Sequence, residues 1–201
     1  TMSIQQWLAI FDHIKKLPQY LELKKEKRKV NMYEVVNTFV KPWTVGTGCG
    51  LAVLMSQEVS TPAGLMLSHA WGEDMEELQM CVKQRCDDLR ISLATPLWFC
   101  CFANYQPGDA AGPSISEQLE LDPFGSVLES RELKEEGRGF GMMAVHTSSE
   151  DLYGRLWCVY EVGCAVVAGV PVCAAISEEY THEVKRRIDV FLDAEDEEWL
   201  T

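Results

Sequence analysis

The stretch Gly64-Leu-Met-Leu-Ser68 begins the part of the chain whose pattern decides the fold. This short apolar run predicts a strand, and a helical pattern follows it from about Glu73. Four apolar positions at helical spacing are expected to face inward: Met75, Leu78, Val82 and Leu89. Short apolar runs that alternate with longer helical patterns are typical of a parallel sheet flanked by helices.

The same alternation continues towards the C-terminus. Further strands are expected at 97–103, 141–145 and 170–176, and helices at 114–121, from 122 towards 136, at 150–168 and at 178–192. Ser114 with Glu117 three residues later is typical of a helix capping box. We therefore predict an α/β domain over residues 61–201, with a flavodoxin-like open parallel sheet.

The first 60 residues follow a different pattern. Apolar residues at spacings of three and four from Ile4 to Ile14 predict a helix that Ser3 caps and Pro18 ends. A second helix is expected around 33–40, stopped by Pro42. The glycines of 45–50 lack the Lys-Ser/Thr ending of a phosphate-binding P-loop. We predict a helical N-terminal extension (1–60) that packs on the α/β domain or on a neighbour.

Charge and composition limit the partners. A net charge of −13 argues against DNA or an anionic membrane as the main partner, so nucleic acid is an unlikely ligand. The basic run 24–29 is interpreted as a solvated surface, with a handle for another subunit or a nucleic acid as the alternative. The longest apolar stretch, 162–175, is too short for a transmembrane helix, which needs roughly 20 apolar residues.

The eight cysteines lie inside apolar runs, and none forms a Cys-x-x-Cys pair. Buried free thiols are typical of a reducing compartment, and no secretory signal opens the sequence. A cytoplasmic protein is therefore expected. A structural zinc site is not expected, and His146 has no second ligand at a helical offset. We predict no metal site.

Polar residues follow three of the predicted strands: Ser68-His-Ala-Trp71, Asn104-Tyr-Gln106 and His146-Thr-Ser-Ser149. Ligands of open parallel sheets bind beyond the carboxyl ends of the strands, so the functional site is expected among these loops.

Residues 61–176 resemble TIR (Toll/interleukin-1 receptor-like) domains. The resemblance is carried by Leu65-Met-Leu-Ser-His-Ala-Trp-Gly-Glu-Asp74, by Trp98-Phe-Cys-Cys-Phe-Ala-Asn-Tyr-Gln-Pro-Gly-Asp109 at the place of the variable BB loop, and by Arg155-Leu-Trp-Cys-Val-Tyr-Glu-Val162. The last motif is the most specific. The chain departs from the family in lacking an acidic residue near Asn104, in its long 121–139 connection, and in having no fifth strand after the last helix.

The resemblance implies either adaptor-style assembly or cleavage of NAD⁺, and it places the catalytic glutamate of the NAD⁺-cleaving members at Glu161. Nicotinamide leaves as a neutral group, so a carboxylate that stabilises the developing oxocarbenium ion is the chemistry required. Trp157 lies one helical turn before Glu161 and could stack on the pyridinium ring. NAD⁺ is then a substrate, and no cofactor is expected.

The expected rim of the site consists of Ser68, His69, Trp71, Asn104 and Tyr105. Each also has a structural interpretation: Ser68 as a helix cap, and the aromatic residues as packing groups. A thiol pair of Cys158 with His69 is conceivable, although nothing local supports a lowered thiol pKa.

We therefore expect an NAD⁺ glycohydrolase that yields nicotinamide and ADP-ribose or a cyclic form. The alternatives are a non-enzymatic TIR-like signalling module that self-associates through the 104–113 loop, and a nucleoside-processing transferase. An enzyme needs Glu161 in an open cleft, whereas an assembly module tolerates a buried or paired glutamate.

Overall fold

The computed structural model describes residues 1–56, 61–134 and 139–198, with side chains described up to Asp193. Its centre is a five-stranded sheet in the order β1-β3-β2-β4-β5. The strands are β1 (Met2–Ser3), β2 (Leu65–Ser68), β3 (Pro96–Phe99), β4 (Met142–His146) and β5 (Val172–Ile176). β1 pairs antiparallel with β3, and the other four strands are parallel. Those four follow a flavodoxin-like order.

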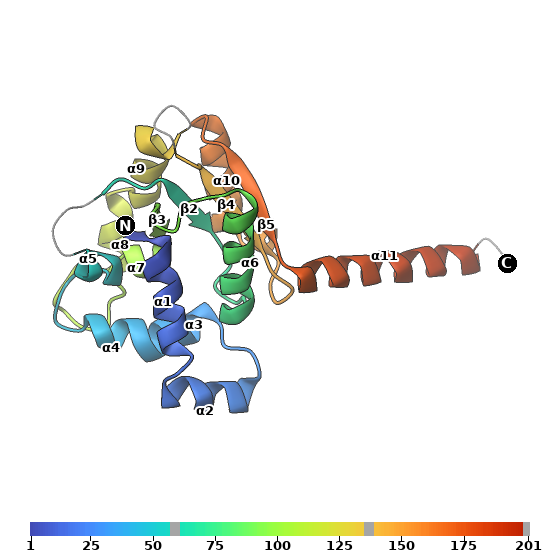
Figure 1. Cartoon of the computed structure of the whole chain (residues 1–201), viewed down its shortest axis with the longest axis horizontal. Helices are drawn as coiled ribbons and strands as arrows, with labels where there is room; N and C mark the ends of the chain where they lie inside the picture. Colours follow the sequence, from blue (N-terminus) through green and yellow to red (C-terminus); the bar gives the residue numbers. More distant parts are fainter. Residues whose placement is uncertain (57–60, 135–138, 199–201) are drawn as a thin grey trace.

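Helices cover both faces of the sheet (Figure 1). On one face, α1 (Ile4–Ile14) and α6 (Met75–Asp88) share a buried cluster with Leu65 and Leu67 of β2. On the other face, α9 (Pro123–Glu129) and α10 (Leu156–Val167) share a second buried cluster with Met66 of β2. Successive side chains of β2 thus point to opposite helical layers, as in a strand that is covered on both sides. The predicted α/β class is confirmed.

The strand expected at 97–103 is shorter than predicted. β3 ends at Phe99, and the chain turns at once into α7 (Cys100–Ala103). Phe102 of α7 is buried, and its ring lies 5.6 Å from that of Phe11 in α1. The sequence stays apolar after Phe99 because α1 buries the turn into α7. The strand itself does not continue.

Several helix boundaries also differ from those expected. α8 (Ile115–Glu120) has the predicted capping box, but α9 ends at Glu129 and gives way to a 3₁₀ turn, Arg131–Leu133. The predicted continuation towards Glu136 lies partly outside the described residues. α10 begins at Leu156 instead of 150, after another 3₁₀ turn. Leu89, expected to face inward, is 41% exposed because α6 ends at Asp88.

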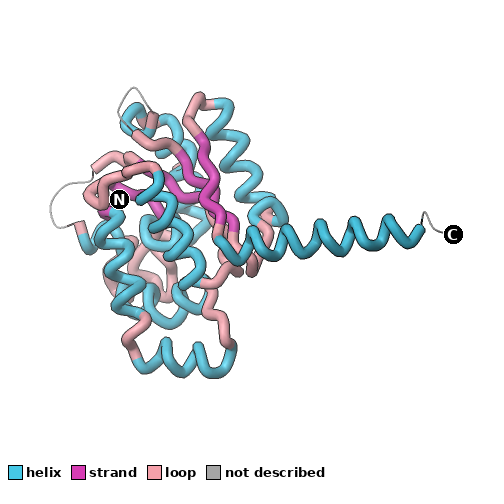
Figure 2. The backbone as a smooth tube through the Cα atoms, turned by 45° about the vertical axis from the view of Figure 1, so that its right-hand side comes forward, coloured by secondary structure: helices cyan, strands magenta, loops and turns pink. Residues whose placement is uncertain are grey.

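The C-terminal helix α11 (Glu178–Glu198) is longer than predicted and leads away from the body of the molecule (Figures 1 and 2). Figure 2 shows the strands running between the helices of the body, while α11 projects beyond them.

The N-terminal segment is helical, as predicted. α1 has a capping box formed by Ser3 and Gln6. Pro18, expected to end α1, instead lies in the first turn of a further helix, α2 (Pro18–Lys27), where its missing N–H is tolerated. Pro42 does not stop the next helix: α3 (Met32–Val35) passes through a π-helical turn, Val36–Val40, into α4 (Lys41–Thr44). α5 (Leu51–Met55) follows the glycine-rich loop.

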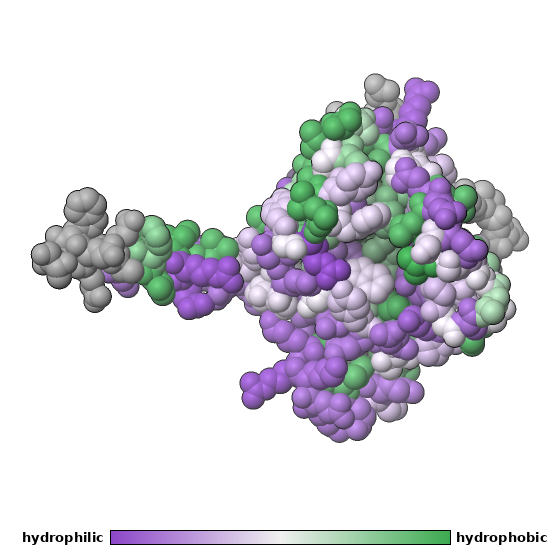
Figure 3. Space-filling view, turned by 180° about the vertical axis from the view of Figure 1, so that it is seen from behind, coloured by the Kyte–Doolittle hydropathy of each residue, from purple (hydrophilic) through white to green (hydrophobic). Residues whose placement is uncertain are grey.

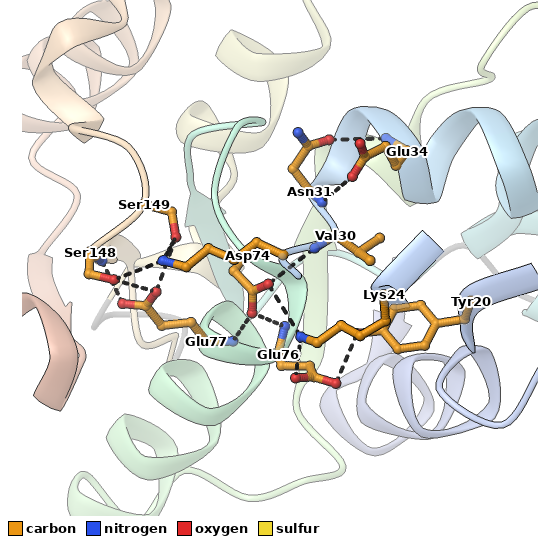
Figure 4. Close-up of polar contacts among 11 residues, drawn as sticks. Tyr20, Lys24, Val30, Asn31, Glu34, Asp74, Glu76, Glu77, Ser148 and Ser149 are labelled. Carbon is orange, nitrogen blue, oxygen red and sulfur yellow. Dashed lines mark hydrogen bonds and ion pairs between the residues drawn. The ribbon is translucent and has the colours of Figure 1, made fainter. Parts of the chain in front are cut away.

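This segment packs on the sheet and completes its core. The rings of Trp7 and Phe11 lie 5.6 Å and 6.3 Å from that of Phe99. Polar contacts add to this packing (Figure 4): Lys24 forms ion pairs with Glu76 at 2.6 Å and Asp74 at 3.7 Å. Lys29 donates to Ser149 at 2.9 Å. Two lysines of the basic run thus bind the chain's own α/β part. No helix in the described ranges has the length and apolar character needed to cross a lipid bilayer.

Candidate active site

The carboxyl end of β2 lies at the point where the strand order reverses. β2 pairs with β3 on one side and with β4 on the other, and the connections leave it in opposite directions. Ligand crevices of open α/β sheets form at such a point. Ser68, the last residue of β2, is fully buried there, and His69 follows it.

Glu161 comes to this point from α10. With Cys158 and Ala165 it forms the buried stripe of the helix, at spacings of three and four residues. Its side chain is 4% exposed, and Ser68 Oγ donates a 2.6 Å hydrogen bond to its carboxylate. Burial raises the pKa of Glu161 to about 7, and the neighbouring Cys100 adds to the rise. Hydrogen bonds from Ser68 and Trp157 and the charge of His69 oppose it.

Glu161 also borders a groove of about 670 Å³ between α9 and α10. The described lining combines the aromatic rings of Phe124 and Tyr160 with the cation of Lys134, from the segment after α9. Trp157 stands beside this lining: its ring lies 5.1 Å from Phe124 and 5.9 Å from Tyr160, and the residue is 45% exposed. The predicted aromatic neighbour of Glu161 is thus half-exposed beside a groove large enough for a ligand.

A second polar group lies next to Ser68. His69 Nδ1 contacts the Glu73 carboxylate at 2.7 Å, and its Nε2 lies 3.4 Å from Cys100 Sγ and 3.5 Å from Cys101 Sγ. The imidazole stacks on Phe99 with ring centroids 4.4 Å apart. Burial alone would lower the pKa of His69, but Cys100 and Glu73 outweigh it and raise that pKa to about 10. Burial raises the pKa of Glu73 to about 7.

Trp71 and Cys158 surround this group. Trp71 lies close enough to Cys100 to help lower the pKa of that thiol, and its ring packs 5.2 Å from that of Tyr33. Cys158 Sγ lies 3.4 Å from the backbone carbonyl oxygen of His69, so this thiol meets the main chain and not the imidazole. The conceivable Cys158–His69 pair is therefore wrong, and the sulfurs beside the ring belong to Cys100 and Cys101.

Asn104 and Tyr105 are held in their own loop. The backbone N–H of Asn104 donates a 3.1 Å hydrogen bond to the Cys100 carbonyl oxygen, at the C-terminal end of α7. Tyr105 is 3% exposed, its hydroxyl donates to Asp109, and its backbone forms two 2.9 Å hydrogen bonds with Gln118. Asp109 in turn accepts from the N–H of Gly46 at 2.6 Å. The glycine-rich loop thus packs on the 104–113 loop, and these contacts do not involve Glu161.

The third polar loop closes around Glu77, a residue that the sequence analysis did not single out. Glu77 is 8% exposed and accepts hydrogen bonds from Ser148 Oγ at 2.9 Å and Ser177 Oγ at 2.6 Å. His146 is buried between the rings of Tyr153 and Tyr180, at 5.3 Å and 5.5 Å, and these contacts give it a packing role.

Of the five predicted rim residues, the structure brings Ser68, His69 and Trp71 to the region around Glu161, and it places Trp157 there too. Glu73, Cys100 and Cys101 were missed. The His69–Glu73 spacing of four residues was an available signal, but a strand through 103 would have put the two thiols on opposite faces. Compared with known proteins, the chain matches no family model, no curated protein and no solved structure.

Proposed function

We propose that this chain is a TIR-like NAD⁺ glycohydrolase in which Glu161 is the catalytic carboxylate. It cleaves the nicotinamide–ribose bond and releases nicotinamide together with ADP-ribose or a cyclic form. The observation that carries the proposal is the position of Glu161: Ser68 holds its carboxylate at the switch point of the sheet, and the residue borders a groove of about 670 Å³.

Cleavage of the nicotinamide–ribose bond by this route needs one carboxylate and passes through no metal-bound or covalent intermediate. The C–N bond to the ribose breaks, nicotinamide takes the bonding electrons and leaves neutral, and positive charge develops on the sugar. Ionised Glu161 stabilises that charge. Ser68 hydrogen-bonds Oε2, and the carboxylate borders the groove in which a ribose hydroxyl or the attacking water, whose proton it accepts, would bind.

The groove offers two kinds of contact that a dinucleotide uses, aromatic stacking and a cation. Phe124 and Tyr160 supply aromatic faces for a nicotinamide or adenine ring, and Lys134 supplies a cation for a phosphate. Its volume of about 670 Å³ is within the range of ligand pockets, roughly 300–1,000 Å³.

The test is nicotinamide release from NAD⁺ at high protein concentration. Glu161→Gln and Glu161→Ala are expected to lose at least about 100-fold in rate, as enzymes do when an electrostatic stabiliser is removed. Glu129→Gln is the matched control, because Glu129 borders the same groove from α9 and is exposed. It should retain activity within a few-fold. Circular dichroism and thermal unfolding check that each variant folds.

Absence of nicotinamide release at every concentration, even with crowding agents, contradicts the proposal. Cleavage of free nucleosides with no action on NAD⁺ would instead support a nucleoside-processing transferase that uses the same glutamate.

The second candidate function is assembly without catalysis. It is favoured by the burial and pairing of Glu161, and by exposed apolar side chains on α10 and β5. Leu156, Val166 and Val167 of α10 are 85%, 65% and 89% exposed, and Ile176 of β5 is 54% exposed. Figure 3, seen from behind, shows apolar areas on the surface of the body. Exposed apolar side chains mark interaction sites where they form a contiguous patch.

Sedimentation or size-exclusion analysis over a range of concentrations tests self-association. Val167→Asp is expected to weaken it, whereas Leu121→Asp, at a residue 77% exposed near α8, should leave it unchanged. A protein that stays monomeric at every concentration would contradict assembly through this face.

A further inference from the structure

Three atoms that can bind a metal ion, one imidazole nitrogen and two sulfurs, lie together where β3 ends. His69 Nε2, Cys100 Sγ and Cys101 Sγ lie within 4.8 Å of one another. The two nitrogen–sulfur distances are 3.4 Å and 3.5 Å, and the sulfurs are 3.9 Å apart. All eight cysteines are free, so neither sulfur is held in a disulfide.

These separations fit a shared metal ion. Zinc lies about 2.3 Å from a thiolate sulfur and about 2.05 Å from an imidazole nitrogen, in tetrahedral geometry. Donors at those lengths stand about 3.6 Å apart for nitrogen and sulfur and about 3.8 Å apart for two sulfurs. His69, Cys100 and Cys101 already hold such spacings without a change of backbone.

A second, independent feature is the partner of the other imidazole nitrogen. His69 Nδ1 contacts Glu73 Oε1 at 2.7 Å, and Glu73 is fully buried. A carboxylate that accepts Nδ1–H fixes the tautomer whose Nε2 carries a free lone pair, and metal-bound histidines almost always have such a partner. Thr147 Oγ1 stands 3.5 Å from the second carboxylate oxygen. Glu73 is therefore held on the side of the ring that faces away from the sulfurs.

We propose that His69, Cys100 and Cys101 bind one Zn²⁺ ion, with Glu73 as the residue that positions the imidazole. Two thiolates neutralise the two charges of the ion, so the buried group carries less uncompensated charge than two thiolates beside a carboxylate would. Three protein ligands leave the fourth tetrahedral position for a water molecule. The proposal does not rest on the glycohydrolase activity.

The strand-to-helix turn explains how neighbouring cysteines can bind one ion. In a continuous strand, Cys100 and Cys101 would point to opposite faces of the sheet. β3 ends at Phe99 and α7 begins at Cys100, so successive side chains are separated by a helical rotation of about 100° and both sulfurs reach the imidazole. Cys101 is buried and Cys100 is partly exposed, which leaves an approach for the ion.

The experiment measures bound zinc in the purified full chain after equilibration with Zn²⁺ under a thiol-free reductant and gel filtration. One equivalent is expected for the wild type, and a loss of most of it in Cys100→Ser and in Cys101→Ser. Cys158→Ser is the matched control and should retain the metal, because its sulfur meets the His69 carbonyl and not the ring. X-ray absorption of the zinc-loaded wild type should show two sulfur ligands.

Glu73→Gln tests the positioning role. It keeps the size of the side chain but weakens the acceptor for Nδ1–H, and zinc affinity should fall about 10- to 100-fold, the usual effect of losing such a partner. Chelation of the wild type gives a readout without any variant: the Tm should fall when the ion is removed and recover when Zn²⁺ is returned. A wild type that retains no zinc, or equal zinc in all three cysteine variants, would overturn the proposal.

Discussion

Ser68 Oγ donates a 2.6 Å hydrogen bond to Glu161, which joins the carboxyl end of β2 to the middle of α10. The contact links residues 93 positions apart, and both are buried. It is the point at which the sheet and the groove between α9 and α10 meet. Changes at either residue should therefore affect both the stability of the fold and the proton affinity of the carboxylate.

Ser68→Ala tests this link. The hydrogen bond from Ser68 lowers the pKa of Glu161, so its removal should raise that pKa above about 7 and move the rise of the proposed glycohydrolase activity to higher pH. A buried carboxylate without its donor should also cost about 1–3 kcal/mol of stability at pH 8. The measurements are the pH profile of kcat/KM and urea unfolding. Ser126→Ala, at an exposed position of α9, should change neither; an unchanged profile in Ser68→Ala would contradict the role assigned to this contact.

Glu161→Gln should change how stability depends on pH. The usual pKa of a glutamate is 4.5, and burial raises that of Glu161 to about 7. Between these pH values the folded chain keeps a proton that the unfolded chain has released, so this group destabilises the fold as pH rises through the window. The total effect is on the order of 3 kcal/mol. Urea unfolding from pH 4 to pH 8.5 should show the wild type losing stability relative to Glu161→Gln. If the two proteins differ in free energy of unfolding by the same amount at every pH, the pKa of Glu161 is not raised in the folded chain.

Gly163 allows the groove to be filled without disturbing the fold. It lies within α10 and borders the groove, and an added Cβ would meet no atom within 4 Å. Gly163→Ala should therefore stabilise the protein by about 0.5–1 kcal/mol, through helix propensity. Gly163→Trp should fold and raise the KM for NAD⁺, because its ring occupies the groove. The contrast is Gly125→Ala on α9, whose Cβ would lie 2.0 Å from the Asp122 carboxylate that caps this helix. That variant should be destabilised by about 1 kcal/mol.

Phe11→Ala tests whether the N-terminal helices and the sheet unfold together. Phe11 is fully buried and packs against Phe99 and Phe102 from β3 and α7. The loss should be about 3–5 kcal/mol, in one cooperative transition by calorimetry. Leu21→Ala, at a residue 50% exposed on α2, should remain within about 0.5 kcal/mol of the wild type. Two separate transitions, only one of them affected, would contradict a shared core.

Local patterns were sufficient to predict most of the fold. The apolar stripe of α1 and the Ser114–Glu117 cap depend on residues within a few positions of one another, and both are confirmed. α2 could not be predicted in this way, because Tyr20 is its one buried residue. It is held by long-range contacts: Tyr20 and Lys24 both bind Glu76 of α6, 56 and 52 residues away.

The candidate site was predictable where it depends on the topology of the sheet. Ser68 and Glu161 are in contact because β2 ends at the switch point and the buried side of α10 packs against that end of the strand. The Cys100–Cys101 pair was not predictable, because its placement depends on where β3 stops, and burial under α1 fixes that end. Tyr105 was expected at the rim, but its loop binds Gln118 and Gly46, two partners that local spacing does not reveal.

The two edges of the sheet differ in what they can accept. β1 has two residues and leads directly into α1, so this edge of the sheet offers few free backbone groups. Such short edge strands resist pairing with other chains. β5 has five residues, ends the described sheet on the other side, and leaves Val172 and Ile176 exposed. Of the two edges, the one at β5 is therefore the better suited to accept a strand from another molecule. When two copies pair their β5 strands about a two-fold axis, neither β5 edge remains free. Assembly then stops at a dimer and does not continue into a fibre.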